Sequence, residues 1–187
     1  MGMNYTPVQC VNIKQREEIL RATCTEALGE LVVNTLISDG FLTAPASTKY
    51  HGNYEGGLFD HSVNVARALE ALTIDGYLTW KEDSPTRAPW VVGILHDLCK
   101  IDQYAQTLDG YTWNNEPVIK GHGMKSVIYA QAMGARLSAE ERACIIYHMG
   151  AFTSKEEWQD YTHAIHKYPA VLWTHTADMM ASHIMEV

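Results

Sequence analysis

His96 and Asp97 are adjacent residues at the end of the most apolar stretch of this 187-residue chain, and Lys100 follows them closely. The stretch Trp90 to Leu98 is mostly apolar and predicts a buried helix. Burying an imidazole and a carboxylate costs free energy unless another group compensates, and a metal cation is the strongest compensation available. In a continuous helix Lys100 lies three and four residues beyond the pair, so we expect all three side chains to face one site.

Four further polar residues fall on the inward faces or at the ends of other predicted helices: His61, His122, His148 and Asp178. A single histidine on an apolar face is more often hydrogen-bonded to a backbone carbonyl than bound to a metal. Six imidazole and carboxylate groups together are what a two-metal site requires, because nitrogen and oxygen donors hold divalent ions and a carboxylate such as Asp97 can bridge them.

The elements that must position these residues are mostly helices. Apolar residues recur at three- and four-residue intervals, with Gly and Pro at the breaks, and predict these helical segments: 12–38 (one or two helices), 58–72, 90–98, 121–133, 138–150 and 169 onward. Ser138 and Glu141 form a predicted capping box. Residues 104–113 around Asp109-Gly110 predict a β-hairpin, which is either a rim, a lid or an oligomer contact, or a surface excursion without a role at the site. Residues 151–167 are interpreted as a polar connector.

Length and composition narrow the class of protein. The length suits one domain, 1–187, with packing helices in 1–42 and a metal-binding core in 49–184. The net charge of −8, without a basic block, disfavours long nucleic acid, although a metal site that cancels negative charge leaves a phosphate ligand open. No apolar stretch approaches the ~20 residues needed to span a bilayer, and residues 1–7 lack the features of a secretory signal. Four scattered cysteines suit a reducing compartment, so we expect a cytoplasmic protein.

The order of these residues resembles the ligand set of the HD-domain superfamily of metal-dependent phosphohydrolases. His96-Asp97-Leu98-Cys99-Lys100 is similar to the His-Asp-x-Gly-Lys motif of that family. Residues 55–61 and Gly121-His122-Gly123 look like motifs of bacterial HD hydrolases, including the branch fused to oligonucleotide-binding domains in 3′ to 5′ exoribonucleases. The resemblance covers roughly Lys49 to Ile184. Cys99 stands where glycine is common, a change we expect to affect only helix packing. We expect no nucleic-acid-binding domain on this chain, which disfavours a polymer substrate.

The resemblance implies an all-α helical bundle and two divalent transition metal ions (Fe, Mn, Co, Ni or Zn). It implies that His61, His96 and Asp178 hold one ion, that His122 and His148 hold the other, and that Asp97 bridges the two.

We expect Asp97, Lys100 and Glu55 to be catalytic. Lys100 would contact the phosphate, because its ammonium can offset charge on the phosphoryl oxygens. Glu55 would orient a water or accept a substrate hydroxyl. Tyr54 and His175 are candidate substrate contacts, with Tyr147 as a further pocket residue.

The expected function is hydrolysis of a phosphoester or phosphoanhydride in a small, nucleotide-like substrate by metal-activated hydroxide. Two alternatives stay open. The same ligand set resembles that of the mixed-valent di-iron oxygenases of the superfamily, and the fold could serve as a non-catalytic nucleotide-binding module. A homo-oligomer is also left open.

Overall fold

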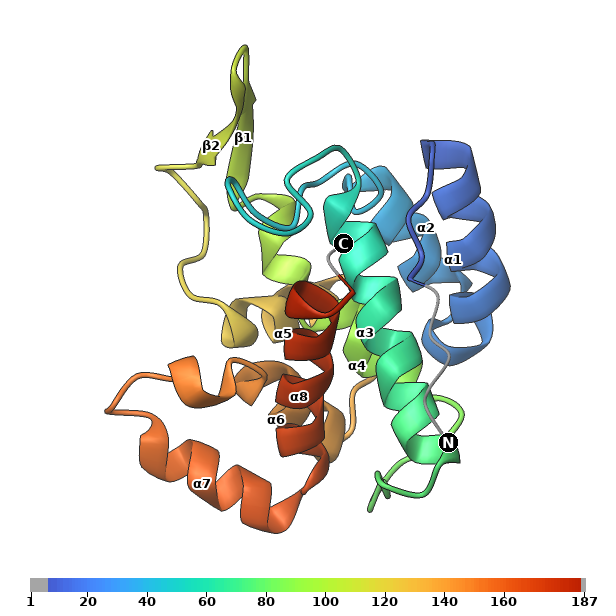
Figure 1. Ribbon diagram of the computed structural model, residues 1–187, viewed down its shortest axis with the longest axis vertical. Helices are drawn as coiled ribbons and strands as arrows, with labels where there is room; N and C mark the ends of the chain where they lie inside the picture. Colours follow the sequence, from blue (N-terminus) through green and yellow to red (C-terminus); the bar gives the residue numbers. More distant parts are fainter. Residues whose placement is uncertain (1–6, 186–187) are drawn as a thin grey trace.

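The computed structural model describes residues 7–185 and confirms the expected mostly helical fold with a small β-hairpin (Figure 1). Residues 1–7 were expected to lack a secretory signal. Of these, residues 1–6 lie outside the described part. Within that part the α-helices are α1 (Ile13–Leu28), α2 (Glu30–Ser38), α3 (Gly57–Ile74), α4 (Ala88–Leu95), α5 (Gly123–Ala132), α6 (Ala139–Tyr147), α7 (Trp158–Lys167) and α8 (Ala170–His183). In residues 7–185 each helix is too short or too polar to cross a bilayer.

The first helical segment is two helices, separated at Gly29. The side chain of Asn12 accepts a hydrogen bond from the Gln15 backbone N–H at 2.9 Å and caps the start of α1. Gly29 has φ 88°, a left-handed value that favours glycine, and it ends α1 directly before α2 begins.

Helix α3 runs through the middle of the molecule, where it packs against α4 and α8 (Figure 1). The contact with α4 is unusually close at Gly93: a Cβ added there would lie 2.4 Å from the backbone of Ala66 on α3. Because glycine leaves this space to the other backbone, α4 can approach α3 and bring its end beside His61.

A helix is present as expected in the region 90–98, but the predicted position of its end is wrong. Helix α4 stops at Leu95, His96 is its C-cap, and Leu98–Ile101 form a separate 3₁₀ turn, η1. Consecutive side chains on a continuous α-helix diverge by about 100°. Because the helix breaks at His96 and Asp97, the side chains of these two adjacent residues can point into the same cluster.

Two further segments surround the bundle. Strand β1 (Tyr104–Thr107) pairs antiparallel with β2 (Gly110–Trp113), as expected, and the hairpin projects from the body of the molecule (Figure 1). The segment interpreted as a connector contains a 3₁₀ turn, η2 (Gly150–Phe152), and helix α7. Helix α7 was missed although Trp158, Tyr161 and Ile165 recur at helical spacing, with Tyr161 buried and Ile165 packed against the core.

Candidate metal centre

The imidazoles of His96 and His148 are each anchored by the backbone one turn earlier. His96 Nδ1 lies 2.8 Å from the Gly93 carbonyl oxygen, and His148 Nδ1 lies 2.7 Å from that of Ile145. A carbonyl oxygen can only accept, so each Nδ1 carries the proton. The opposite nitrogen, Nε2, therefore presents a lone pair to the centre of the bundle, the state in which histidine binds metals.

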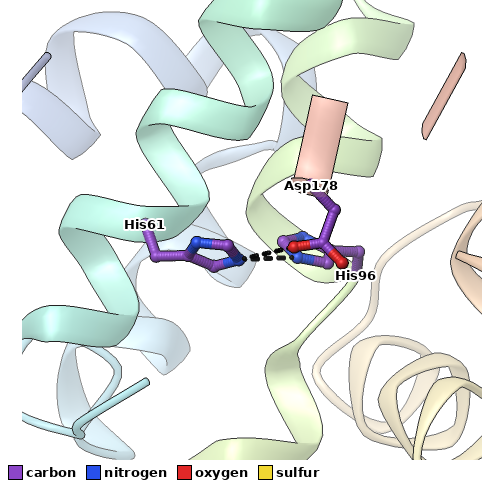
Figure 2. Close-up of side chains that lie close together, drawn as sticks. All are labelled: His61, His96 and Asp178. Carbon is purple, nitrogen blue, oxygen red and sulfur yellow. Dashed lines mark hydrogen bonds and ion pairs between the residues drawn. The ribbon is translucent and has the colours of Figure 1, made fainter. Parts of the chain in front are cut away.

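One group of donor atoms joins α3, the end of α4 and α8 (Figure 2). His61 Nε2 lies 3.2 Å from His96 Nε2 and 3.2 Å from Asp178 Oδ1. Both imidazoles are fully buried, and the Asp178 side chain is 17% exposed. Asp178 is thus the member of this group that reaches toward solvent.

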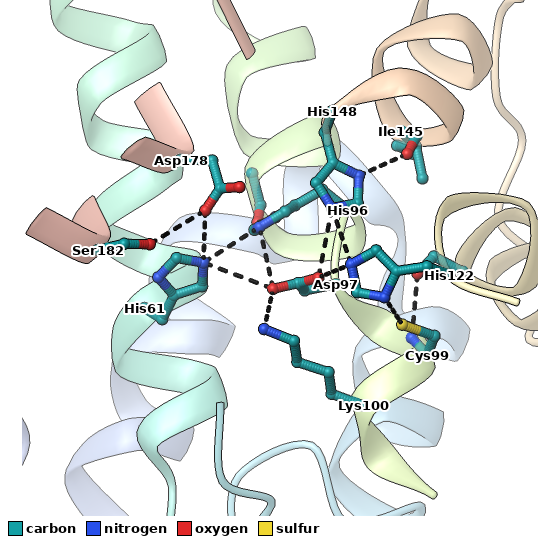
Figure 3. A network of polar contacts seen from close by, with 12 residues as sticks. His61, His96, Asp97, Cys99, Lys100, His122, Ile145, His148, Asp178 and Ser182 are labelled. Atoms are coloured by element: carbon teal, nitrogen blue, oxygen red, sulfur yellow. Dashed lines mark hydrogen bonds and ion pairs between the residues drawn. The ribbon is translucent and has the colours of Figure 1, made fainter. Parts of the chain in front are cut away.

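A second group surrounds Asp97 (Figure 3). Its Oδ1 lies 2.9 Å from His122 Nε2 and 3.4 Å from His148 Nε2, and these two nitrogens are 3.1 Å apart. Its Oδ2 lies 3.5 Å from His96 Nε2 and 3.6 Å from His61 Nε2. The two oxygens of one carboxylate therefore face different pairs of imidazoles.

This arrangement fits a cation better than a hydrogen-bonded cluster. Among the described residues no hydrogen bond of good geometry reaches the buried Asp97 Oδ1, although the Nε2 atoms of His122 and His148 lie 2.9 Å and 3.4 Å from it. Atoms bound to one ion at ~2.0–2.1 Å are roughly 3 Å apart, which is how the paired Nε2 atoms are spaced. All six predicted ligands belong to groups whose donor atoms lie within 4.8 Å of one another. These buried groups could hold a metal ion.

The pKa shifts in the cluster also indicate that Asp97 is a buried anion, which a bound cation would stabilise. Burial raises the pKa of Asp97, but the Lys100 ammonium and the contacts with the neighbouring imidazoles outweigh it and hold the pKa well below its usual value. Burial lowers the pKa of His61 and of His148, which favours the neutral imidazole. Burial also acts against a charged His122, but contacts with Asp97 and Cys99 raise its pKa to about 10. A bound cation would take the place of that proton.

Cys99 was expected to affect only packing, but its thiol contacts a predicted ligand. Cys99 Sγ lies 3.1 Å from His122 Nδ1, and Asp97, Cys99 and His122 form one of the groups that could hold a metal. The Cys99 backbone N–H donates to Ser126 Oγ on α5 at 3.0 Å, which ties the 3₁₀ turn to the helix that His122 precedes. The sequence feature that could have indicated this contact is Cys99 itself, which occupies the glycine position of the His-Asp-x-Gly-Lys motif.

The remaining predicted residues lie at different distances from the cluster. Lys100 Nζ is 2.6 Å from Asp97 Oδ2, and the charge of Asp97 outweighs burial and raises the lysine's pKa. Tyr54 donates a hydrogen bond to Asp60 Oδ2 at 3.0 Å, and His175 Nδ1 donates to the His148 carbonyl oxygen at 3.0 Å. Glu55 is exposed. The substrate and catalytic roles of these residues stay predictions.

A cavity of about 500 Å³ opens onto the cluster, a size typical of small-molecule sites. Asp97, Lys100, His122, His148 and Asp178 are among its lining residues. His51, which the sequence did not single out, also lines it, and its ring centre lies 5.0 Å from that of His61. His51 comes from the turn-rich loop before α3, where no periodic pattern marks a residue as inward.

A scan of protein-family models found no match for the chain, and comparisons with curated proteins and with solved structures found none either. The structure by itself defines a helical protein with a buried group of imidazoles and carboxylates that could bind metal.

Proposed function

We propose that this chain is a metal-dependent phosphohydrolase of the HD type, which hydrolyses a phosphoester or phosphoanhydride of a small, nucleotide-like substrate. The observation that carries the proposal is the position of Asp97. A buried carboxylate whose two oxygens face separate pairs of imidazole Nε2 atoms is suited to bridging two divalent ions. His61, His96 and Asp178 would hold one ion, and His122 and His148 the other.

Divalent cations bound there would supply a water of lowered pKa and would polarise a phosphoryl oxygen. The Asp97 carboxylate is ionised at neutral pH, because its pKa lies well below the usual range. The Lys100 ammonium, which lines the cavity, can offset charge that develops on the phosphoryl oxygens during hydrolysis. The cavity of about 500 Å³ is large enough for a small phosphorylated molecule.

The test begins with the metal content of freshly purified protein, followed by loading with Mn²⁺, Fe²⁺ or Co²⁺. Phosphate release is then measured over a panel of nucleotides. Cyclic dinucleotides, whose hydrolysis opens a phosphodiester without freeing phosphate, are followed by chromatography of the linear product. We expect release from at least one substrate and a loss of roughly 100-fold or more in Asp97→Asn, since the carboxylate is removed from the centre of the cluster. Asp75→Asn, an exposed aspartate at the end of α3 that lies far along the helix from His61, is the matched control and should retain activity.

Circular dichroism of Asp97→Asn separates loss of chemistry from loss of fold. Phosphate release that persists in a folded, metal-depleted Asp97→Asn protein would count against the proposal. Oxygen uptake by the iron-loaded protein, without phosphate release from any substrate, would favour the oxygenase alternative.

A further inference from the structure

The chain between Asp97 and His122 builds a second pocket beside the cavity. This side pocket, of about 390 Å³, is lined by residues of segment 103–121 together with Lys125. Gln103, Trp113 and Gly121 line both the side pocket and the main cavity. The two spaces therefore adjoin, and Trp113 stands on their shared border.

Trp113 is an exposed aromatic residue held in a defined position. It is 58% exposed, although its strand pairs it directly with Tyr104. The two rings meet at 5.2 Å with an interplanar angle of 67°, an edge-to-face contact that fixes the indole on the hairpin. An ordered indole left half in water beside a cavity offers a flat surface on which another ring can stack.

Polar groups line the rest of the side pocket. The exposed Asn115 carboxamide and the exposed Lys120 ammonium can both form hydrogen bonds. The Lys125 ammonium is paired with the Asp102 carboxylate, and the Asn114 amide donates to the Asp102 carbonyl oxygen at 2.8 Å. The Asn114 bond holds the segment against the end of the 3₁₀ turn, and the Lys125 pair holds that turn against α5, so the stacking ring and the exposed polar groups sit on a fixed support.

From these observations we infer that segment 103–121 is a base-recognition element: a nucleotide binds with its base stacked on Trp113, its polar edge toward the side pocket, and its phosphate at Lys100 and the cation site beside Asp97. This rests on the proposed function for the position of the phosphate. Stacking is tolerant of base identity, because every base has a π-face. A phosphate site and a stacking surface in adjoining pockets fit a nucleotide better than a polyphosphate or an aliphatic phosphate ester, which has no ring to place.

The test is calorimetric binding to the metal-loaded full chain of four nucleoside monophosphates, inorganic phosphate and glycerol phosphate. Trp113→Leu removes the ring but keeps apolar bulk, and Trp113→Phe keeps a ring. Trp158→Leu is the matched control, because Trp158 is 48% exposed on α7 and packs against Tyr161. We expect Trp113→Leu to weaken every nucleotide roughly 10-fold or more, and to leave inorganic phosphate and glycerol phosphate within about twofold. Trp113→Phe should restore most of the nucleotide affinity, and Trp158→Leu should resemble the unaltered protein.

Equal nucleotide affinity in Trp113→Leu and the unaltered protein would overturn the inference. A parallel loss of inorganic phosphate binding would overturn it too, since the residue would then act on the whole cavity. Phosphate release from nucleotides in either case would leave the proposed function standing. Trp113-dependent nucleotide binding without phosphate release from any substrate would support the inference while the proposed function failed.

Discussion

At the scale of single residues, the direction of each imidazole lone pair decides what the cluster can bind. Backbone carbonyl oxygens fix His96 and His148 with Nε2 directed inward. For His122 the corresponding partner of Nδ1 is the Cys99 thiol, at 3.1 Å. Groups that hold the far nitrogen of a ligating histidine fix its tautomer and orientation, and their removal typically costs about 10–100-fold in metal affinity.

We therefore predict that Cys99→Ala weakens binding of Co²⁺ by about 10–100-fold at the position that His122 and His148 would form. The Co²⁺ affinity of Cys99→Ser, whose hydroxyl can still accept a hydrogen bond from His122, should fall between those of Cys99→Ala and the unaltered protein. Chelator competition measures the affinities. Cys24→Ala is the control, because Cys24 is also buried but contacts Thr23 on α1. Unchanged Co²⁺ affinity in Cys99→Ala would show that the thiol does not position His122.

At the scale of elements, the crossing of α3 and α4 determines whether His61 and His96 meet. The backbones are closest at Gly93, whose carbonyl oxygen also anchors His96. A methyl group placed there meets the Ala66 backbone, which has no alternative rotamer by which it can move aside.

Gly93→Ala is accordingly expected to destabilise the fold by about 1–3 kcal/mol and to reduce metal stoichiometry, because α4 must move away from α3. Urea unfolding and metal analysis of the folded fraction provide the two readouts. Gln131→Ala, on the exposed side of α5, is the control for an alanine placed in a helix. Full stability and full metal content in Gly93→Ala would contradict the close approach.

At the scale of the whole molecule, the core excludes solvent from all four cysteines. Burial raises the pKa of Cys24 to about 11, and burial together with the charge of Asp60 raises that of Cys10 to about 12. Burial also raises the pKa of Cys144. Because only the thiolate reacts, raised pKa values and burial both slow alkylation near neutral pH.

The folded protein should therefore incorporate less than one equivalent of iodoacetamide at pH 8, whereas the denatured protein should incorporate four, as the sequence contains four cysteines. Labelling of Cys24 should increase only as the pH rises toward its pKa of about 11. Mass spectrometry of the labelled peptides gives the position and extent. Rapid labelling of Cys24 at pH 8, with an unchanged circular dichroism spectrum, would contradict the packing around α1.

The sequence by itself determined the helical class, the hairpin at Asp109-Gly110 and the capping box at Ser138, which is present as expected. It also picked out the six residues that the structure brings together, through residue type and family resemblance. Helix periodicity, turn residues and caps act over a few positions, so they can be detected in a single chain.

Only the tertiary structure decided the break between His96 and Asp97, the contact of Cys99 with His122, the position of His51, and which imidazoles each oxygen of Asp97 faces. These features depend on side chains that lie far apart in sequence and meet through helix packing. His61 and Asp178, for example, are brought within 3.2 Å by the contact of α3 with α8. Local sequence patterns carry no measure of such distances, because the distances are set jointly by every helix of the core.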